Sequence, residues 1–268
     1  MACVALSLYT ADTPQVFRRV AALMEWLWLL ALFVLFAYTV EAVTGFGSIV
    51  IALSLGALLL PVPELLPVLV PLNILMTGWL SWRLRRHIDF RLLLTRILPL
   101  MGAGTLTGYL LLPLVSEQWL KPLFGMLIVW FSGRELWRLH HDKPVRHPRW
   151  ITPPLIFSAG MTHGLFASGG PLLVYALAGT TLDKARFRAT LISVWFILNS
   201  GLTIAFLLDG RLFSALPTIV WLAGLIPVGV MLGGYLHHHV DESVFRKLVY
   251  SLLVVTGGLL IWTVLYPL

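Results

Sequence analysis

Long apolar segments constrain this chain more than any other feature. Most of them are close to the roughly 20 residues that one membrane-spanning helix needs. Hydrophobic residues make up 59% of the 268 residues and charged residues only 12%, too few to cover a soluble fold of this size. We therefore expect an all-α polytopic membrane protein, because helices satisfy their backbone hydrogen bonds internally in lipid. The segments lie at about residues 23–60, 65–82, 92–112, 118–137, 151–178, 188–208, 214–236 and 245–265.

Charge and cysteine content exclude several classes of protein. The net charge of +7 comes from basic residues in short loops, which favours the positive-inside rule over nucleic-acid binding. Cys3 is the single cysteine, so neither a disulfide framework nor a cysteine metal site is expected. His237, His238 and His239 would point in different directions on a helix, so we predict no metal site. We expect no cofactor either.

The two halves of the chain repeat the same order of features, about 125 residues apart. Each half opens with an apolar segment that is interrupted by small residues, at 44–48 and at 167–171. This order indicates an internal duplication, which is common in secondary transporters. The predicted organisation is given by four ranges: an N-terminal tail at 1–22 that is not a signal peptide, a first repeat at 23–137, a basic cytoplasmic linker at 138–150 and a second repeat at 151–268.

The topology of the interrupted segments has two readings. Each segment either crosses the membrane once or enters it and returns as a hairpin of two short helices. The hairpin places more basic residues on the cytoplasmic side, which the positive-inside rule favours. It also leaves an odd number of full spans in each half, so the halves would be inverted. The first segment is long enough for two full crossings, so both readings stay open.

The two interruptions are the best candidates for a binding site. Gly45, Gly47, Gly170 and Pro171 are poor helix formers, and unwound backbone at membrane depth must be buried or line a wet cavity. A break also exposes helix N-terminal N–H groups, which attract anions. The alternative is that the small residues allow close helix packing. The candidate substrate-binding residues at the breaks are Thr44, Gly45, Phe46, Gly47, Ser48, Ser168, Gly169, Gly170 and Pro171.

The glycine motifs resemble those of a known family. The stretches 41–47 (EAVTGFG) and 163–171 (HGLFASGGP) are similar to the paired motifs of the TauE/SafE sulfite exporter family. The stretch 183–190 and the loop 88–90 fit that pattern as well. The resemblance implies a duplicated carrier in a bacterial or archaeal cytoplasmic membrane. Its substrate would be sulfite, an organosulfonate or a related small anion, and its coupling ion would be H⁺ or Na⁺. A homodimer is possible.

Five polar residues within or beside the apolar segments have two readings each. Glu41 and His163 lie near the breaks and are candidates for proton coupling, or they make structural contacts. Arg188 would attract the anion or anchor its helix at the membrane surface. Asn73 and Asn199 would contact substrate or bind helix to helix.

Three classes of function are compatible with these observations. A secondary carrier with alternating access around the breaks fits best. A passive channel or cation transporter would be expected to place several carboxylates in the membrane, where we find only Glu41. A membrane-embedded enzyme would need a nucleophile, an acid–base pair or a metal set within mutual reach, and no such spacing is visible.

Overall fold

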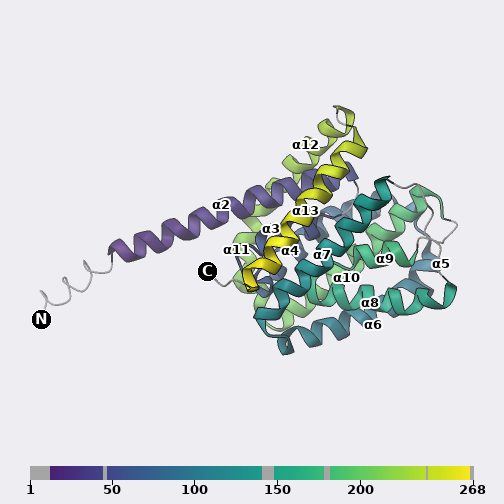
Figure 1. Ribbon diagram of the computed structural model, residues 1–268, viewed down its shortest axis with the longest axis horizontal. Helices are drawn as coiled ribbons and strands as arrows, with labels where there is room; N and C mark the ends of the chain where they lie inside the picture. The colour runs from purple at the N-terminus through teal and green to yellow at the C-terminus, as the bar shows by residue number, and fades with distance from the viewer. Residues whose placement is uncertain (1–12, 45–46, 141–147, 178–181, 240, 266–268) are drawn as a thin grey trace, which may run out of the picture.

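The computed structural model describes residues 13–44, 47–140, 148–177, 182–239 and 241–265, and these residues contain helices but no strand. The expected all-α fold is confirmed. Figure 1 shows the helices packed side by side, with α7 and α13 crossing the front and α6 and α8 along one edge. The helices are α2 (Thr13–Thr44), α3 (Ser48–Gly56), α4 (Val62–Arg83), α5 (Phe90–Leu92), α6 (Leu98–Leu111), α7 (Glu117–His140), α8 (Thr152–Phe166), α9 (Gly170–Ala176), α10 (Lys184–Leu208), α11 (Arg211–Ala223), α12 (Leu225–His239) and α13 (Glu242–Leu265).

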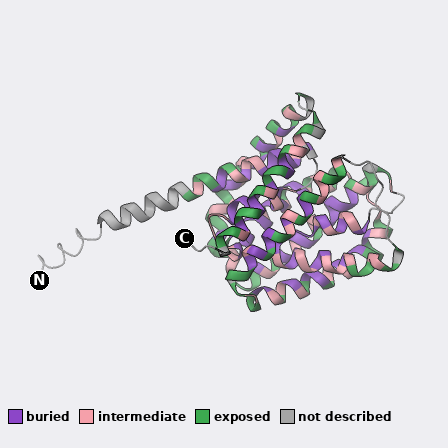
Figure 2. Ribbon diagram, viewed as in Figure 1, coloured by how far each residue is buried: buried purple, intermediate pink, exposed green. Residues whose placement is uncertain are grey.

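The chain spans a membrane. Within the described part of the chain, four helical stretches are long and apolar enough to cross a bilayer: Trp26–Val43, Val62–Arg83, Phe90–Leu114 and Ala185–Leu208. Helices α11 and α12, bent by 41° relative to each other, make a fifth if they form one broken span. The outward faces of the bundle are exposed (Figure 2) and carry large apolar side chains such as Leu208 and Met231. Such a surface is stable against lipid.

Both predicted interruptions are real breaks in helices. The first long helix ends at Thr44 and α3 begins at Ser48, after Gly47 with φ of 102°. This left-handed backbone favours glycine. In the second half, α8 ends at Phe166, Ala167 adopts φ of 50°, and α9 begins at Gly170.

At the first break the chain turns back on itself. The Ser48 amide reaches the Glu41 carboxylate, and at the far end of α3 a Cβ built on Gly56 would lie 3.6 Å from Leu30. Helix α3 therefore returns along α2, as in the hairpin reading. The expectation of two short helices was wrong for the first arm, because α2 has 32 residues while α3 has 9.

Close glycine contacts join α8 to α6. Gly104 and Gly108 of α6 face Gly160 and Gly164 of α8 so closely that a Cβ at any of them would overlap a backbone carbonyl of the partner helix. Small residues with this four-residue spacing let helix backbones approach in membranes.

Helices α2 and α12 repeat this arrangement. Gly229 and Gly233 of α12 press on α2 at Tyr38 and Ala42, and they follow Gly104 and Gly108 by 125 residues (229 minus 104). This offset is the one found between the two halves of the sequence.

The remaining long helices pair across the two halves of the chain. Helices α4 and α10 run antiparallel, since Asn73 bonds to Asn199 while Ser81 bonds to Ser193. Helices α7 and α13 also run antiparallel, with Gly125 against Gly257 and Phe131 against Tyr250. The centre of the bundle, where α4 and α10 cross, is therefore flanked by both broken segments.

Candidate functional site

The two breaks meet around one cavity. It offers about 70 Å³ to the centres of water molecules, room for several waters, since one needs roughly 10–15 Å³ on this measure. Its polar lining comes from Gly47 and Ser48 at the first break and from Ser168 and Gly170 at the second, with Pro171 beside them. Glu41, Asn73 and Asn199 also line it. The apolar wall is made of Val40, Ile49, Val50, Ile51, Phe131, Ala167, Val174, Leu191, Trp195, Val249, Tyr250 and Leu253.

On the side of the first break, the polar groups satisfy one another. The Ser48 amide donates to the Glu41 carboxylate over 3.1 Å. The Asn73 side-chain NH₂ donates to the Ser48 hydroxyl at 3.0 Å and lies 3.5 Å from the same carboxylate. Glu41, Ser48 and Asn73 are all buried. A carboxylate in this position is held by hydrogen bonds from both the backbone and a side chain, which a buried charge requires.

On the side of the second break, the polar groups are unsatisfied. Among the described residues, neither His163 ring nitrogen has a hydrogen-bond partner, nor has the Ser168 hydroxyl or the Asn199 side-chain oxygen. All three side chains are almost fully buried, at 0%, 3% and 1% exposed. The Asn199 amide lies beside the His163 ring but outside hydrogen-bond geometry. Such buried groups are costly unless a water or a ligand completes them.

The backbone at the first break points donors at the cavity. Ile51 makes the first helical hydrogen bond of α3, to Gly47, so the amides of Ser48, Ile49 and Val50 have no acceptor within the helix. The Ser48 amide is taken by Glu41. The second break offers fewer donors than predicted, because Pro171, the second residue of α9, has no N–H.

The two asparagines and His163 differ in how they are held. Asn199 donates its amide to the Asn73 oxygen at 2.7 Å, so the two asparagines do join α4 to α10, and they line the cavity as well. The ring of His163 stacks on Trp195, with centroids 5.7 Å apart, and is not a packing histidine held by hydrogen bonds.

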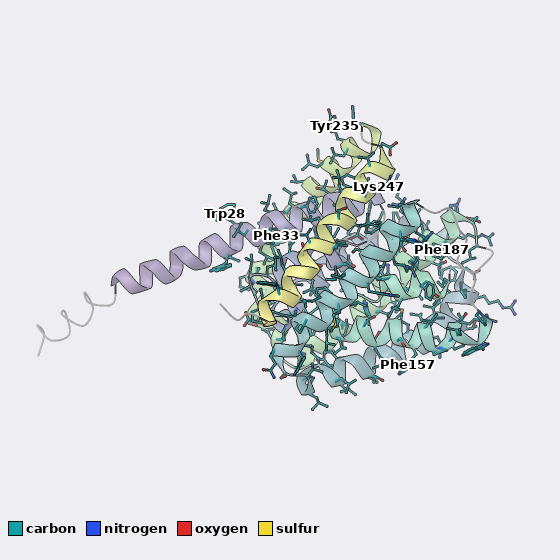
Figure 3. All side chains as sticks on the ribbon, in the orientation of Figure 1. Trp28, Phe33, Phe157, Phe187, Tyr235 and Lys247 are labelled. Carbon is teal, nitrogen blue, oxygen red and sulfur yellow. The ribbon has the colours of Figure 1, made fainter. Side chains whose placement is uncertain are left out.

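Arg188 lies outside the cavity. It is exposed near the start of α10, three residues before Leu191 and hence on the face that continues through Trp195 to Asn199. Figure 3 shows its neighbour Phe187 at the end of the bundle near α5, where the Asp89 amide bonds to Thr190. This position is one turn beyond the lining, towards solvent.

Of the remaining predicted break residues, the structure describes Gly169, and it does not line the cavity. Gly169 packs against the Ala159 carbonyl, as expected if its small size allows the helices to pack closely. Gly45 and Phe46 lie outside the described residues, as does the side chain of Thr44 at the end of α2.

Sequence reasoning missed the aromatic part of the wall. Trp195 precedes Asn199 by one helical turn, a spacing that places both on one face and that would have identified it. Tyr250 and Phe131 contact each other from α13 and α7, with centroids 5.8 Å apart. No sequence signal joins residues so far apart. The described residues contain no group of three His, Cys, Asp or Glu side chains that would hold a metal ion.

A polytopic helical membrane protein with a small cavity between two broken helices, lined in part by polar groups, has the architecture of a membrane transporter. The sequence model described as Sulfite exporter TauE/SafE matches residues 30–260. The chain belongs to this family, which confirms the resemblance of its glycine motifs. No curated protein and no solved structure matches the chain significantly. The family implies a membrane transporter that exports sulfite or a related anion.

Proposed function

We propose that this protein is a secondary active transporter that exports sulfite or a small organosulfonate and binds it in the cavity between the breaks. The observation that carries the proposal is the buried Ser168 hydroxyl, a donor that lines the cavity and has no hydrogen-bond partner among the described residues. The ring of His163, stacked on Trp195, is likewise buried and without a hydrogen bond to any described residue. Hydroxyl, imidazole and amide N–H groups all donate to an oxyanion. A bound oxyanion would satisfy groups that otherwise carry a desolvation penalty of about 1–3 kcal/mol each.

The lining favours an anion over a cation. Among the described lining residues Glu41 is the one carboxylate, and it already accepts hydrogen bonds from Ser48 and Asn73. A cation site would need several oxygen ligands turned into the cavity. The aromatic and aliphatic wall suits the carbon part of an organosulfonate.

Glu41 would couple the anion to a proton. Its carboxylate accepts a hydrogen bond from the Ser48 amide, a donor that the substrate anion would also use. Two negative charges sharing these donors would repel each other at close range, so the anion binds when Glu41 is protonated. Anion and proton would then occupy the site together, with His163 as the second proton-carrying candidate. Na⁺ remains the alternative coupling ion.

The helix pairing supports alternating access by inverted repeats. Antiparallel contact between the equivalent helices α4 and α10, at Asn73 and Asn199, is what a two-fold axis in the membrane plane would produce. In this proposal, one half moves against the other around the fixed cavity. The linker at 138–150 would be cytoplasmic.

The test is flux into proteoliposomes that contain the purified chain. Sulfite, sulfoacetate, sulfate and thiosulfate are compared, each with and without a pH gradient. Saturable uptake of one anion, accelerated by the gradient, is expected. Chemical conversion of the anion without flux would instead favour an enzyme, and non-saturable flux would favour a channel.

Glu41→Gln tests the coupling. Glutamine imitates the protonated carboxyl group and still accepts from Ser48, so transport should become independent of pH between about pH 5 and pH 8. His163→Gln is the matched variant in the other half. If Glu41→Gln keeps the wild-type pH profile and His163→Gln loses it, the proton is carried by the second break.

A further inference from the structure

A half-buried arginine one helical turn from the cavity has N–H donors without a hydrogen-bond partner among the described residues. The side chain of Arg134 in α7 is only 16% exposed, and its Nη2 contacts the Glu135 carboxylate at 2.6 Å. Its Nε and Nη1 atoms are buried and have no hydrogen-bond partner among the described residues. One nitrogen of the guanidinium is thus neutralised while the N–H groups of the other two are unpaired.

The surroundings hold this guanidinium in place. It lies over the Tyr175 ring of α9 at 4.7 Å and over the Trp130 ring at 5.8 Å. Stacking on aromatic faces orients an arginine and leaves its edge free to donate. Buried charged donors without partners are rare in proteins because of their desolvation penalty, so this arrangement needs a further negative partner.

The position of Arg134 links it to the cavity. Phe131, one turn earlier on α7, lines the cavity, as does Val174, the neighbour of Tyr175. Helix α9 leads from the cavity towards the start of α10, where Arg188 is exposed. Arg134 therefore lies one turn from the cavity, at the end of the molecule that carries Arg188.

We infer that Arg134 is an anion-binding residue at the mouth of the cavity, where it receives a sulfonate or sulfite oxygen through its unpaired N–H groups. This inference rests on the proposed function and adds a second contact for the same substrate. Charge-assisted hydrogen bonds from arginine to an oxyanion are about twice as strong as neutral ones. The residue would thus set the affinity for the anion, while the central groups set the coupling.

Arg134→Gln and Arg138→Gln form a matched pair for the test. Both substitutions remove one positive charge from α7, and both arginines contact Glu135, but Arg138 is 42% exposed. In proteoliposome flux with the anion that wild type transports, Arg134→Gln should raise KM about tenfold, the effect of one charged hydrogen bond, with Vmax within about twofold. Arg138→Gln should leave KM unchanged, and Arg134→Lys should restore part of the affinity.

Three results would overturn the inference: an unchanged KM in Arg134→Gln, an equal rise in Arg138→Gln, or a fall in Vmax alone. If Arg134→Gln does not fold, Glu135→Gln provides the second test. It frees Nη2 and should lower KM about threefold, because a competing carboxylate is gone; an unchanged or higher KM counts against Arg134. Absence of flux in the wild-type protein would refute the proposed function itself and is separate from these outcomes.

Discussion

The two breaks are built alike but differ in how their polar groups are satisfied. Glu41 and His163 each lie seven residues before the short helix of their hairpin, at Ser48 and Gly170. Glu41 is enclosed by hydrogen bonds from Ser48 and Asn73, whereas His163 and Ser168 have no partner among the described residues. Corresponding positions in the two broken segments thus carry different chemistry.

This difference predicts that the two breaks contribute differently to stability and to anion binding. The polar side chains of the first break are satisfied without a ligand, because Glu41 accepts from the Ser48 amide and Ser48 accepts from Asn73. The second break is complete only when something donates to or accepts from its buried groups. Substitutions in the first break should therefore mainly reduce stability, and those in the second mainly reduce affinity for the anion.

The largest effect is expected at the asparagines. Asn73→Leu removes the donor to Ser48 and Glu41 and leaves the Asn199 NH₂ unpaired, so it should reduce the free energy of unfolding by about 3 kcal/mol or more. Asn199→Leu removes one of these bonds and should reduce it by about half as much. Thermal unfolding of both variants in detergent measures the difference. Equal losses would show that the first break is not the more tightly bonded one.

The second largest effect is expected at the glycines of the breaks, Gly47 and Gly170, which should differ in how much stability an alanine costs. Gly47 has φ of 102°, and nothing lies within 4 Å of an added Cβ, so Gly47→Ala is strained by the backbone alone, by about 1–2 kcal/mol. Gly170→Ala meets only the Trp195 ring at 3.4 Å, an ordinary contact, and should change stability little. Larger side chains at Gly170 would enter the cavity and should abolish transport. Normal flux in both Gly47→Leu and Gly170→Leu would place the site elsewhere.

The two serines separate stability from affinity. Ser48→Ala removes the nearer of the two acceptors of the Asn73 amide, leaving only the longer contact with Glu41, and should lower the free energy of unfolding by about 1 kcal/mol. Ser168→Ala removes a hydroxyl that bonds to no described residue, so its stability should hold while KM for the anion rises severalfold. Unfolding midpoints and flux kinetics on the same preparations test both statements. The reverse pattern would contradict the proposed division between the breaks.

The smallest effect is expected outside both breaks, at Asp209. The Arg211 guanidinium and the Tyr109 hydroxyl donate to this carboxylate, and chiefly the bond from Arg211 lowers the pKa of Asp209 to about 2. A lowered pKa stabilises the fold above the unfolded value of about 3.9, and this contribution is lost as pH falls towards 2. Because a third of the side chain is exposed, it amounts to no more than about 1 kcal/mol.

Asp209→Asn should therefore leave stability below about pH 2 unchanged and reduce it slightly at neutral pH, as measured by unfolding across pH. Any pH dependence of transport between about pH 5 and pH 8 is then due to titratable groups other than Asp209. If Asp209→Asn alters transport in that range, the pH dependence cannot be assigned to the breaks.

Much of the architecture was predictable because it depends on local properties. The lengths of the apolar segments predicted the helices, and the glycine and proline clusters predicted the breaks after Thr44 and Phe166. The length of α2 was not predicted, since residues 1–22, which are mixed in character, were expected to form a tail. The pairing of α6 with α8 rests on glycines whose role appears only when the partner helix is present.

Part of the polar lining of the cavity was predictable from the sequence, but its hydrogen bonds were not. Ser48, Asn73, Ser168 and Asn199 were all identified from their positions, and all line the cavity. Arg188, for which both anion binding and a membrane anchor were predicted, is exposed and does not line the cavity. Arg134 gave no signal, because an arginine near the end of an apolar segment has the appearance of a membrane anchor.

The sequence by itself determined that this chain enters a membrane as helices and that two of its segments break there. Both follow from the hydropathy and backbone preferences of neighbouring residues. Only the tertiary structure decided which polar groups are satisfied and which are left open. Hydrogen bonding depends on distances of about 3 Å between residues such as Asn73 and Asn199, separated by 126 positions, and these distances are set by how the helices pack.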